Sequence, residues 1–191
     1  MSRTIHDDIA SYVPYDKNEA LSVEQLRYFL KDSQNPFSRD NIVAHLVADA
    51  WIVNPERTKV LMLFHAYKGF WMTAGGHCEG TPYVCEDAFR EVFEEMGLDL
   101  RDGSLPTLFD VNTGYLLTRE KEGRIEPEHL HFDICYLMEA DERAPLLPNE
   151  ESTEIKWIPI EELPTLKIMD CHQRRVTKTL DMLNKKATYV A

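Results

Sequence analysis

The sequence predicts an α/β sandwich with a mixed β-sheet, and three observations support this prediction. A long amphipathic helical pattern with clear start and stop signals occupies residues 82–96. Short segments rich in β-branched and aromatic residues precede and follow it, which is typical of strands. A second helical pattern ends the chain. The resulting order of three strands, a helix, further strands and a final helix suits this fold class.

The first part of the chain, residues 1–40, is expected to be an N-terminal helical extension. Apolar residues between positions 21 and 30 indicate a helix that ends before Pro36. Ser22 begins a capping-box pattern, and Asp16 offers a second possible start. We expect this helix to pack on the core or at a dimer interface.

The middle of the chain, residues 41–165, is expected to be the main domain. A turn at Asn54-Pro55 separates its first two strands, and a short helical turn is expected at Glu161 and Glu162. The predicted strands cover residues 42–53, 59–64, 70–73, 107–117, 129–138 and 154–158.

The last part, residues 166–191, is expected to be a C-terminal helix packed on the core. The helical pattern begins at Ile168 and carries Val176, Leu180 and Leu183 on one side.

The central helix has its own boundary signals. Thr81 followed by Pro82 predicts its start, because threonine is a good N-cap and proline fits the first helical position. Gly97 predicts its end in a left-handed cap. Apolar residues at positions 84, 88 and 92, and again at 85, 89 and 93, predict a helix that packs against the protein.

This helix also carries a cluster of carboxylates. Glu91, Glu94 and Glu95 are spaced i, i+3 and i+4, so they share one face. Like charges so placed destabilise a helix, and burying them is costly unless a cation compensates them. Because hard divalent cations prefer carboxylate oxygens, we interpret this face as a Mg²⁺ or Mn²⁺ site rather than as a solvated acidic surface.

The segment from Gly76 to Leu98 resembles the signature box of the Nudix hydrolases. That pattern is Gly, five residues, Glu, seven residues, Arg-Glu, an aliphatic residue, any residue, Glu-Glu, any residue, Gly and an aliphatic residue. The departure is Pro82, which stands where the family has its first Glu. The matching positions are Gly76, Arg90, Glu91, Val92, Glu94, Glu95, Gly97 and Leu98.

Weaker matches at residues 71–77, 126–133 and 149–163 extend the resemblance over residues 41–165. The resemblance implies the Nudix fold, an α/β/α sandwich in which the box helix lies against the sheet. The missing first Glu braces the junction between loop and helix in the family, and Glu79 or Glu86 could replace it here.

The resemblance also implies roles for individual residues. The metal ligands would be Glu91, Glu94 and Glu95, together with the backbone carbonyl of Gly76. Arg90 would orient a carboxylate through a charge-assisted pair. The general base is either a box glutamate, Glu94 or Glu95, or a glutamate on a late loop, for which Glu150 and Glu151 are the candidates.

Histidines form a second group of candidates. His129, His131 and Asp133 alternate along a predicted strand, so they point to one face. They could line a substrate pocket, form a second metal site or simply satisfy core hydrogen bonds. His77 lies in the glycine-rich segment, where it could contact a phosphate, transfer a proton or bond to the loop.

These residues predict metal-dependent hydrolysis of a diphosphate linkage in a nucleoside diphosphate joined to another group. One alternative is a catalytically impaired domain that senses a nucleotide, which only Pro82 supports. Another is an isomerase that resembles isopentenyl diphosphate isomerase, but Gly75 stands where that family has its catalytic cysteine.

Net charge and hydropathy exclude some classes of binding partner. The net charge of −12 and the absence of a basic run argue against nucleic-acid binding. The start of the chain is polar, and no apolar run is long enough to span a membrane. The four cysteines, at positions 78, 85, 135 and 171, lack zinc-site spacing and suggest a reduced, cytoplasmic protein. A homodimer is possible.

Overall fold

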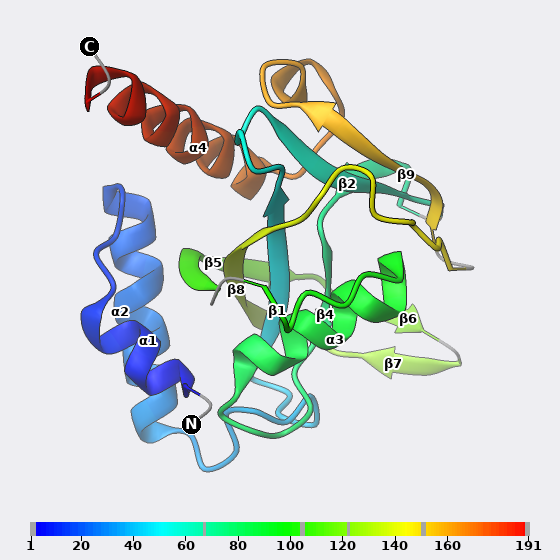
Figure 1. Cartoon of the computed structure of the whole chain (residues 1–191). Helices are drawn as coiled ribbons and strands as arrows, with labels where there is room; N and C mark the ends of the chain where they lie inside the picture. The colour runs from blue at the N-terminus through cyan, green and yellow to red at the C-terminus, as the bar shows by residue number, and fades with distance from the viewer. Residues whose placement is uncertain (1–2, 67, 104–105, 122, 150–151, 190–191) are drawn as a thin grey trace. The chain divides into compact units, whose positions relative to one another are not determined.

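The computed structural model (Figure 1) describes residues 3–66, 68–103, 106–121, 123–149 and 152–189. Its fold is α/β with a mixed sheet and helices at both ends of the chain, so the predicted fold class is confirmed. The helices are α1 (Ile5–Ser11), α2 (Lys17–Asp32), α3 (Val84–Met96) and α4 (Asp170–Tyr189), with one 3₁₀ turn, η1 (Leu163–Thr165). The strands are β1 (Ala44–Val53), β2 (Lys59–His65), β3 (Phe70–Met72), β4 (Ala74–His77), β5 (Thr107–Leu116), β6 (Arg119–Lys121), β7 (Arg124–Glu126), β8 (His129–Glu139) and β9 (Ser152–Pro159).

The chain divides into two compact units. Unit 1 comprises residues 1–49, 75–88 and 108–136, and unit 2 comprises residues 50–74, 89–107 and 137–191. This division differs from the three sequential parts expected from the sequence, whose boundaries stay a prediction.

In unit 1, β1 pairs with β4 and β8, and β8 in turn pairs with β5. The carbonyl of Val43 accepts a hydrogen bond from the amide of Leu130 at 3.1 Å, and the carbonyl of Leu46 accepts one from the amide of Cys78 at 3.2 Å. Carbonyls an odd number of residues apart on a strand point to opposite edges. The chain segment that begins β1 is therefore flanked by β4 on one edge and β8 on the other.

The N-terminal extension contains two helices rather than one. Helix α1 was not predicted from the sequence, although Thr4 caps it in a capping box with Asp7. Helix α2 begins at Lys17, because Asp16 is its N-cap and accepts from the amide of Glu19. The alternative start at Asp16 is therefore correct, the start at Ser22 is wrong, and the predicted end before Pro36 is confirmed.

Two buried carboxylates attach these helices to the rest of unit 1. Glu19 is fully buried, and its carboxylate accepts hydrogen bonds from the hydroxyl of Tyr12 at 2.5 Å and from the amide of Val111 at 3.1 Å. Asp8 pairs with Arg3 and accepts from the hydroxyl of Tyr136 at 2.7 Å. Since a buried carboxylate is costly unless it is satisfied, these contacts fix where the helices pack.

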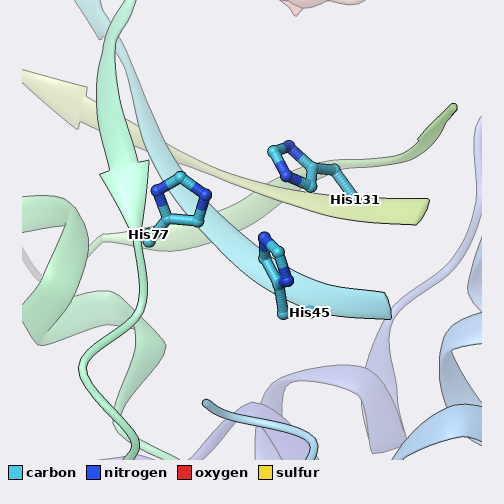
Figure 2. A group of neighbouring side chains, drawn as sticks. All are labelled: His45, His77 and His131. Carbon is cyan, nitrogen blue, oxygen red and sulfur yellow. The ribbon is translucent and has the colours of Figure 1, made fainter. Parts of the chain in front are cut away.

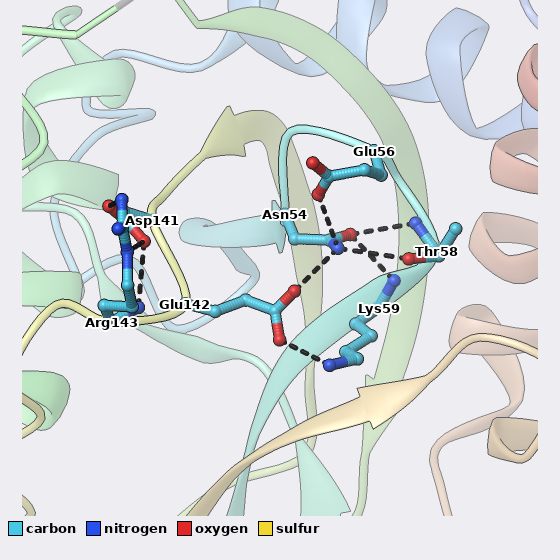
Figure 3. Close-up of polar contacts among 7 residues, drawn as sticks. All are labelled: Asn54, Glu56, Thr58, Lys59, Asp141, Glu142 and Arg143. Atoms are coloured by element: carbon cyan, nitrogen blue, oxygen red, sulfur yellow. Dashed lines mark hydrogen bonds and ion pairs between the residues drawn. The ribbon is translucent and has the colours of Figure 1, made fainter.

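In unit 2, β2 forms an antiparallel ladder with β9 and pairs with β3 and with the end of β1. The predicted turn at Asn54-Pro55 is confirmed. Figure 3 shows how Asn54 organises it: its side-chain oxygen accepts from the amides of Thr58 and Lys59 at 2.8 Å, and its Nδ2 donates to Glu142 at 2.9 Å.

Helix α4 packs within unit 2. Its Thr179 hydroxyl accepts a hydrogen bond from the indole of the buried Trp51 at 3.0 Å. Val176 is buried as predicted, whereas Leu180 is only half-buried, because polar residues such as His172 share the buried face. The short helical turn expected at Glu161 and Glu162 begins slightly later, as η1.

Candidate functional site

The acidic helix α3 starts later than predicted and ends where predicted. Its first residue is Val84 rather than Pro82, because the carbonyl of Pro82 accepts the amide of Ile5 at 2.9 Å instead of bonding within the helix. At the other end Gly97 has a φ of 73°, and its amide donates to the carbonyl of Phe93 at 2.9 Å. The left-handed glycine cap is therefore confirmed.

One of the two apolar repeats on α3 is fully buried. Val84, Ala88 and Val92 have no exposed surface, which confirms that the helix is packed. The second repeat is less buried, since Phe93 is 54 % exposed. Glu91 and Glu95 lie three or seven residues from members of this repeat, so they flank the packed face, and its packing fixes how they are presented.

The three carboxylates lie within about one turn of that acidic face. Glu91 and Glu95 are each only 9 % exposed, and Glu94 is more open. The guanidinium Nη1 of Arg90 pairs with Glu91 at 2.8 Å and with Glu94 at 3.0 Å. Arg90 thus contacts two of the three carboxylates, and its role in orienting them for a metal ion stays a prediction.

This donor set fits a hard divalent cation. Arg90 pairs with Glu91 and Glu94, and Glu91 and Glu95 are buried, so three carboxylates gather on a partly buried stretch of the helix. Mg²⁺ and Mn²⁺ bind such sets through carboxylate oxygens. The roles of Glu91, Glu94 and Glu95 as metal ligands and of Glu94 and Glu95 in catalysis stay predictions.

The glycine-rich segment forms the short strand β4 rather than an open loop. A Cβ added at Gly75 would lie 2.5 Å from the Cβ of Asp49, so only glycine fits there. Gly76 and His77 complete this strand. The carbonyl of Gly76 as a metal ligand stays a prediction.

Asp87 joins the segment after β4 to the first turn of α3. Its carboxylate accepts a hydrogen bond from the amide of Glu79 at 3.3 Å, and the side chain is buried. This contact braces the junction that the first box Glu braces in the family. The sequence analysis considered Glu79 and Glu86 for this role and missed Asp87, although its place in the first helical turn, where acids are favoured, was a usable signal.

Histidines from three strands meet in unit 1 (Figure 2). His45 lies on β1, His77 on β4 and His131 on β8, and their ring centroids are 4.6–5.2 Å apart. His129 joins them, with its Nε2 atom 3.0 Å from Nε2 of His131. We call His45, His77, His129 and His131 the histidine cluster.

Burial lowers the pKa of two rings of this cluster, those of His45 and His131. Burial, together with the neighbouring rings of His45 and His77, lowers the pKa of His131 to about 2. Burial also lowers the pKa of His45, against the opposing effect of its hydrogen bond to Asn41. Neutral imidazole is the form that accepts a proton, a hydrogen bond or a metal ion.

The residues predicted to share one face of a strand, His129, His131 and Asp133, all lie on β8. The rings of His129 and His131 have centroids 4.9 Å apart. Asp133 accepts a hydrogen bond from Asn112 at 3.2 Å. Their roles in substrate binding, and that of His77, stay predictions. Glu150 and Glu151 lie outside the described residues.

The sequence analysis missed His45. It lies in a segment read only as an apolar strand, and it is 3 % exposed. Its partners are distant in the chain, so sequence spacing could not group them. The usable signal was a single histidine inside an otherwise apolar run.

No helix of the described residues is both long enough and apolar enough to cross a bilayer. The NUDIX domain family model matches residues 43–180. No curated protein matched the chain.

Solved structures share the fold at low sequence identity. The NUDIX domain of NrtR from Shewanella oneidensis, solved with ADP ribose, is 15 % identical with a TM-score of 0.55, and the match covers 82 % of this chain and 97 % of that one. A MutT protein from Methanosarcina mazei is 19 % identical with a TM-score of 0.54, covering 75 % and 96 %. An Ap4A hydrolase from C. elegans is 16 % identical with a TM-score of 0.50, covering 73 % and 98 %.

Proposed function

Because this chain belongs to the Nudix family, we propose that it is a Mg²⁺- or Mn²⁺-dependent hydrolase of a diphosphate linkage in a nucleoside diphosphate joined to another group. The family and fold support pyrophosphate hydrolysis in general. The observation that carries the proposal is the face of α3 on which Arg90 pairs with Glu91 and Glu94.

We assign metal binding and proton transfer to residues of this face. Glu91, Glu94 and Glu95 would hold the cation, which screens the diphosphate charge and lowers the pKa of a bound water. Water attacks one phosphorus, its proton passes to a carboxylate acting as general base, and the bond from that phosphorus to the bridging oxygen breaks. Arg90 keeps the carboxylates oriented for both tasks.

The identity of the general base is proposed as Glu94 or Glu95, with a late-loop glutamate as the alternative. The late loop contacts the last turn of α3 through two described residues. The amide of Leu147 donates to the carbonyl of Met96 at 2.9 Å, and Nδ2 of Asn149 lies 3.5 Å from the carbonyl of Glu94. The late-loop candidates, Glu150 and Glu151, lie outside the described residues and stay predictions.

The alternative of a nucleotide sensor rests on Pro82. The contact between Asp87 and the amide of Glu79 weakens that alternative, because it supplies a brace at the same junction. Reaction and sensing are distinguishable, since a sensor binds nucleotide without releasing product.

A phosphate-release screen tests the proposed function. Purified full-length protein is incubated with nucleotide sugars, dinucleotides and nucleoside triphosphates, with Mg²⁺ and Mn²⁺ compared. Nucleoside monophosphates are detected directly for the first two classes. We expect turnover of at least one nucleoside diphosphate derivative that stops with chelator. Binding of nucleotides without turnover of any of them would instead establish the sensor.

The proposal includes a cytoplasmic location and a small-molecule substrate. All four cysteines lie among the described residues, and none is joined in a disulfide, which supports a reducing compartment. Homodimer formation stays a prediction.

A further inference from the structure

The histidine cluster has the geometry of a metal site made of nitrogen donors. His45, His77 and His131 each offer a ring nitrogen, and these atoms all lie within 4.8 Å of one another. Figure 2 shows the three rings converging from neighbouring strands. The proposed diphosphate hydrolysis assigns its metal ligands and its general base to other residues, and it leaves open what ion these histidines could hold.

His45 presents a buried lone pair to the cluster. Its Nδ1 lies 3.2 Å from the carbonyl oxygen of Asn41, and a carbonyl can only accept, so Nδ1 carries the hydrogen. In the neutral ring Nε2 is then an acceptor. This atom is buried and has no hydrogen-bond partner among the described residues. Metal-binding histidines have this arrangement, with one nitrogen bonded to a backbone carbonyl and the other free for the ion.

His129 orients His131 in the same way. Nδ1 of His129 lies 2.7 Å from the carbonyl of Pro127, so it is the donor and Nε2 of His129 is an acceptor. Nε2 of His131, 3.0 Å away, therefore donates to it. This tautomer, assigned from the partners, leaves the lone pair of His131 on Nδ1. His129 thus acts as a positioning residue for a ligand.

The chemistry of the donors selects the class of ion. Imidazole nitrogens suit first-row transition ions such as Zn²⁺ and Co²⁺, whereas Mg²⁺ prefers oxygen. Three histidines with a fourth position left to water form an open tetrahedral site. Zn–N bonds of about 2.0–2.1 Å place ligand nitrogens about 3.4 Å apart, so binding would draw these rings closer.

We propose that His45, His77 and His131 bind one transition-metal dication, of the Zn²⁺ class, at a site separate in its ligands from the carboxylates of α3. The convergence of the three ring nitrogens supports this, as does the buried Nε2 of His45, which has no hydrogen-bond partner among the described residues.

Cobalt titration tests the proposal on the full chain. Protein treated with chelator and then freed of it is titrated with Co²⁺, and the visible absorption is followed. We expect one Co²⁺ per chain with the intense bands of four-coordinate cobalt, displacement by Zn²⁺, and no displacement by excess Mg²⁺. Absence of cobalt and zinc binding by the unsubstituted protein would overturn the site, and so would a thiolate-to-cobalt band, because the ligands would then include cysteine.

Substitutions assign the ligands. His45→Ala and His131→Ala should each weaken Co²⁺ binding at least about tenfold. The exposed His6 offers the matched control, since His6→Ala removes an imidazole outside the cluster. Glu94→Gln should leave Co²⁺ binding unchanged. Equal affinity in all four variants would contradict the assignment.

A measurement on the unsubstituted protein covers the case in which a cluster variant does not fold. In a ¹⁵N-edited imidazole spectrum, Zn²⁺ should shift the ring nitrogens of three ligating histidines out of the seven in the chain. The signal of His6, identified from the His6→Ala control, should not move. A zinc-bound protein whose imidazole nitrogens all keep their shifts would refute the proposal.

Discussion

The acidic face of α3 and the histidine cluster gather metal-binding side chains in opposite ways. On α3, Glu91, Glu94 and Glu95 are charged, and Arg90 orients two of them. In the cluster, burial lowers the pKa of His45 and of His131, and backbone carbonyls accept from Nδ1 of His45 and of His129. The two groups differ in donor type, oxygen on α3 and nitrogen in the cluster, and we expect this difference to give them different ion preferences.

The largest expected effect concerns the carboxylates. Glu94→Gln and Glu95→Gln should each lower Mg²⁺-dependent turnover by about 100- to 10,000-fold, since each loses a metal ligand or general base. Steady-state product release on the substrate found in the screen measures this. Glu86→Gln, an exposed glutamate on the same helix, is the matched control and should keep activity. Full activity in both Glu94→Gln and Glu95→Gln would show that the catalytic site does not lie on α3.

The next effect concerns orientation of those carboxylates. Arg90→Ala should lower turnover by about 10- to 100-fold, as expected when a group that orients metal ligands is removed. Arg90→Lys keeps the charge but not the planar donor geometry, so it should restore only part of the loss. Equal activity of the alanine variant and the unsubstituted protein would show that the ion pairs at Glu91 and Glu94 are incidental.

A smaller effect, on stability, is expected from a substitution in β4, the strand that carries His77. Gly75→Ala places a methyl group 2.5 Å from the Cβ of Asp49 and 2.7 Å from the carbonyl of Ala48. We expect a loss of about 1–3 kcal/mol in the free energy of unfolding, because β4 must move. Gly114→Ala is the control, since its new Cβ would meet its nearest atom at 3.6 Å. Chemical denaturation compares the two, and equal stability would argue against close packing at β4.

The smallest effect should appear at the end of the acidic helix. Gly97→Ala strains a backbone with φ of 73°, at a cost of about 1–2 kcal/mol. It also crowds Leu147, whose Cβ would lie 2.7 Å away. Gly123→Ala has the same strain, with φ of 75° and nothing within 4 Å. The difference in unfolding free energy between Gly97→Ala and Gly123→Ala measures the cost of crowding Leu147. A zero difference would show that Leu147 moves away at no cost.

The acidic face could be predicted from the sequence, because a helix converts spacing directly into a shared face. Glu91, Glu94 and Glu95 lie within five consecutive positions, and Gly97 marks the helix end by its backbone conformation. The predicted start of the helix, Pro82, was wrong because the carbonyl of Pro82 accepts a hydrogen bond from the amide of Ile5. This contact joins distant segments, so capping rules based on neighbouring residues do not predict it.

The histidine cluster could be predicted only in part. Alternation along β8 predicted that His129 and His131 share a face, and their ring contact confirms it. The meeting with His45 and His77 depends on which strands pair with β1. Strand pairing between distant segments is set by tertiary packing, so the cluster became visible only in the structure.

Manganese binding tests the central claim, that the carboxylates of α3 rather than the histidines hold the hard cation. Mn²⁺ uptake is measured by electron paramagnetic resonance, with and without nucleotide, in the unsubstituted chain, the Glu94→Gln/Glu95→Gln double variant and His45→Ala. We expect Mn²⁺ uptake by the unsubstituted chain and by His45→Ala, and loss of uptake in the double variant. No uptake by the unsubstituted chain, or full uptake by the double variant, would contradict the claim.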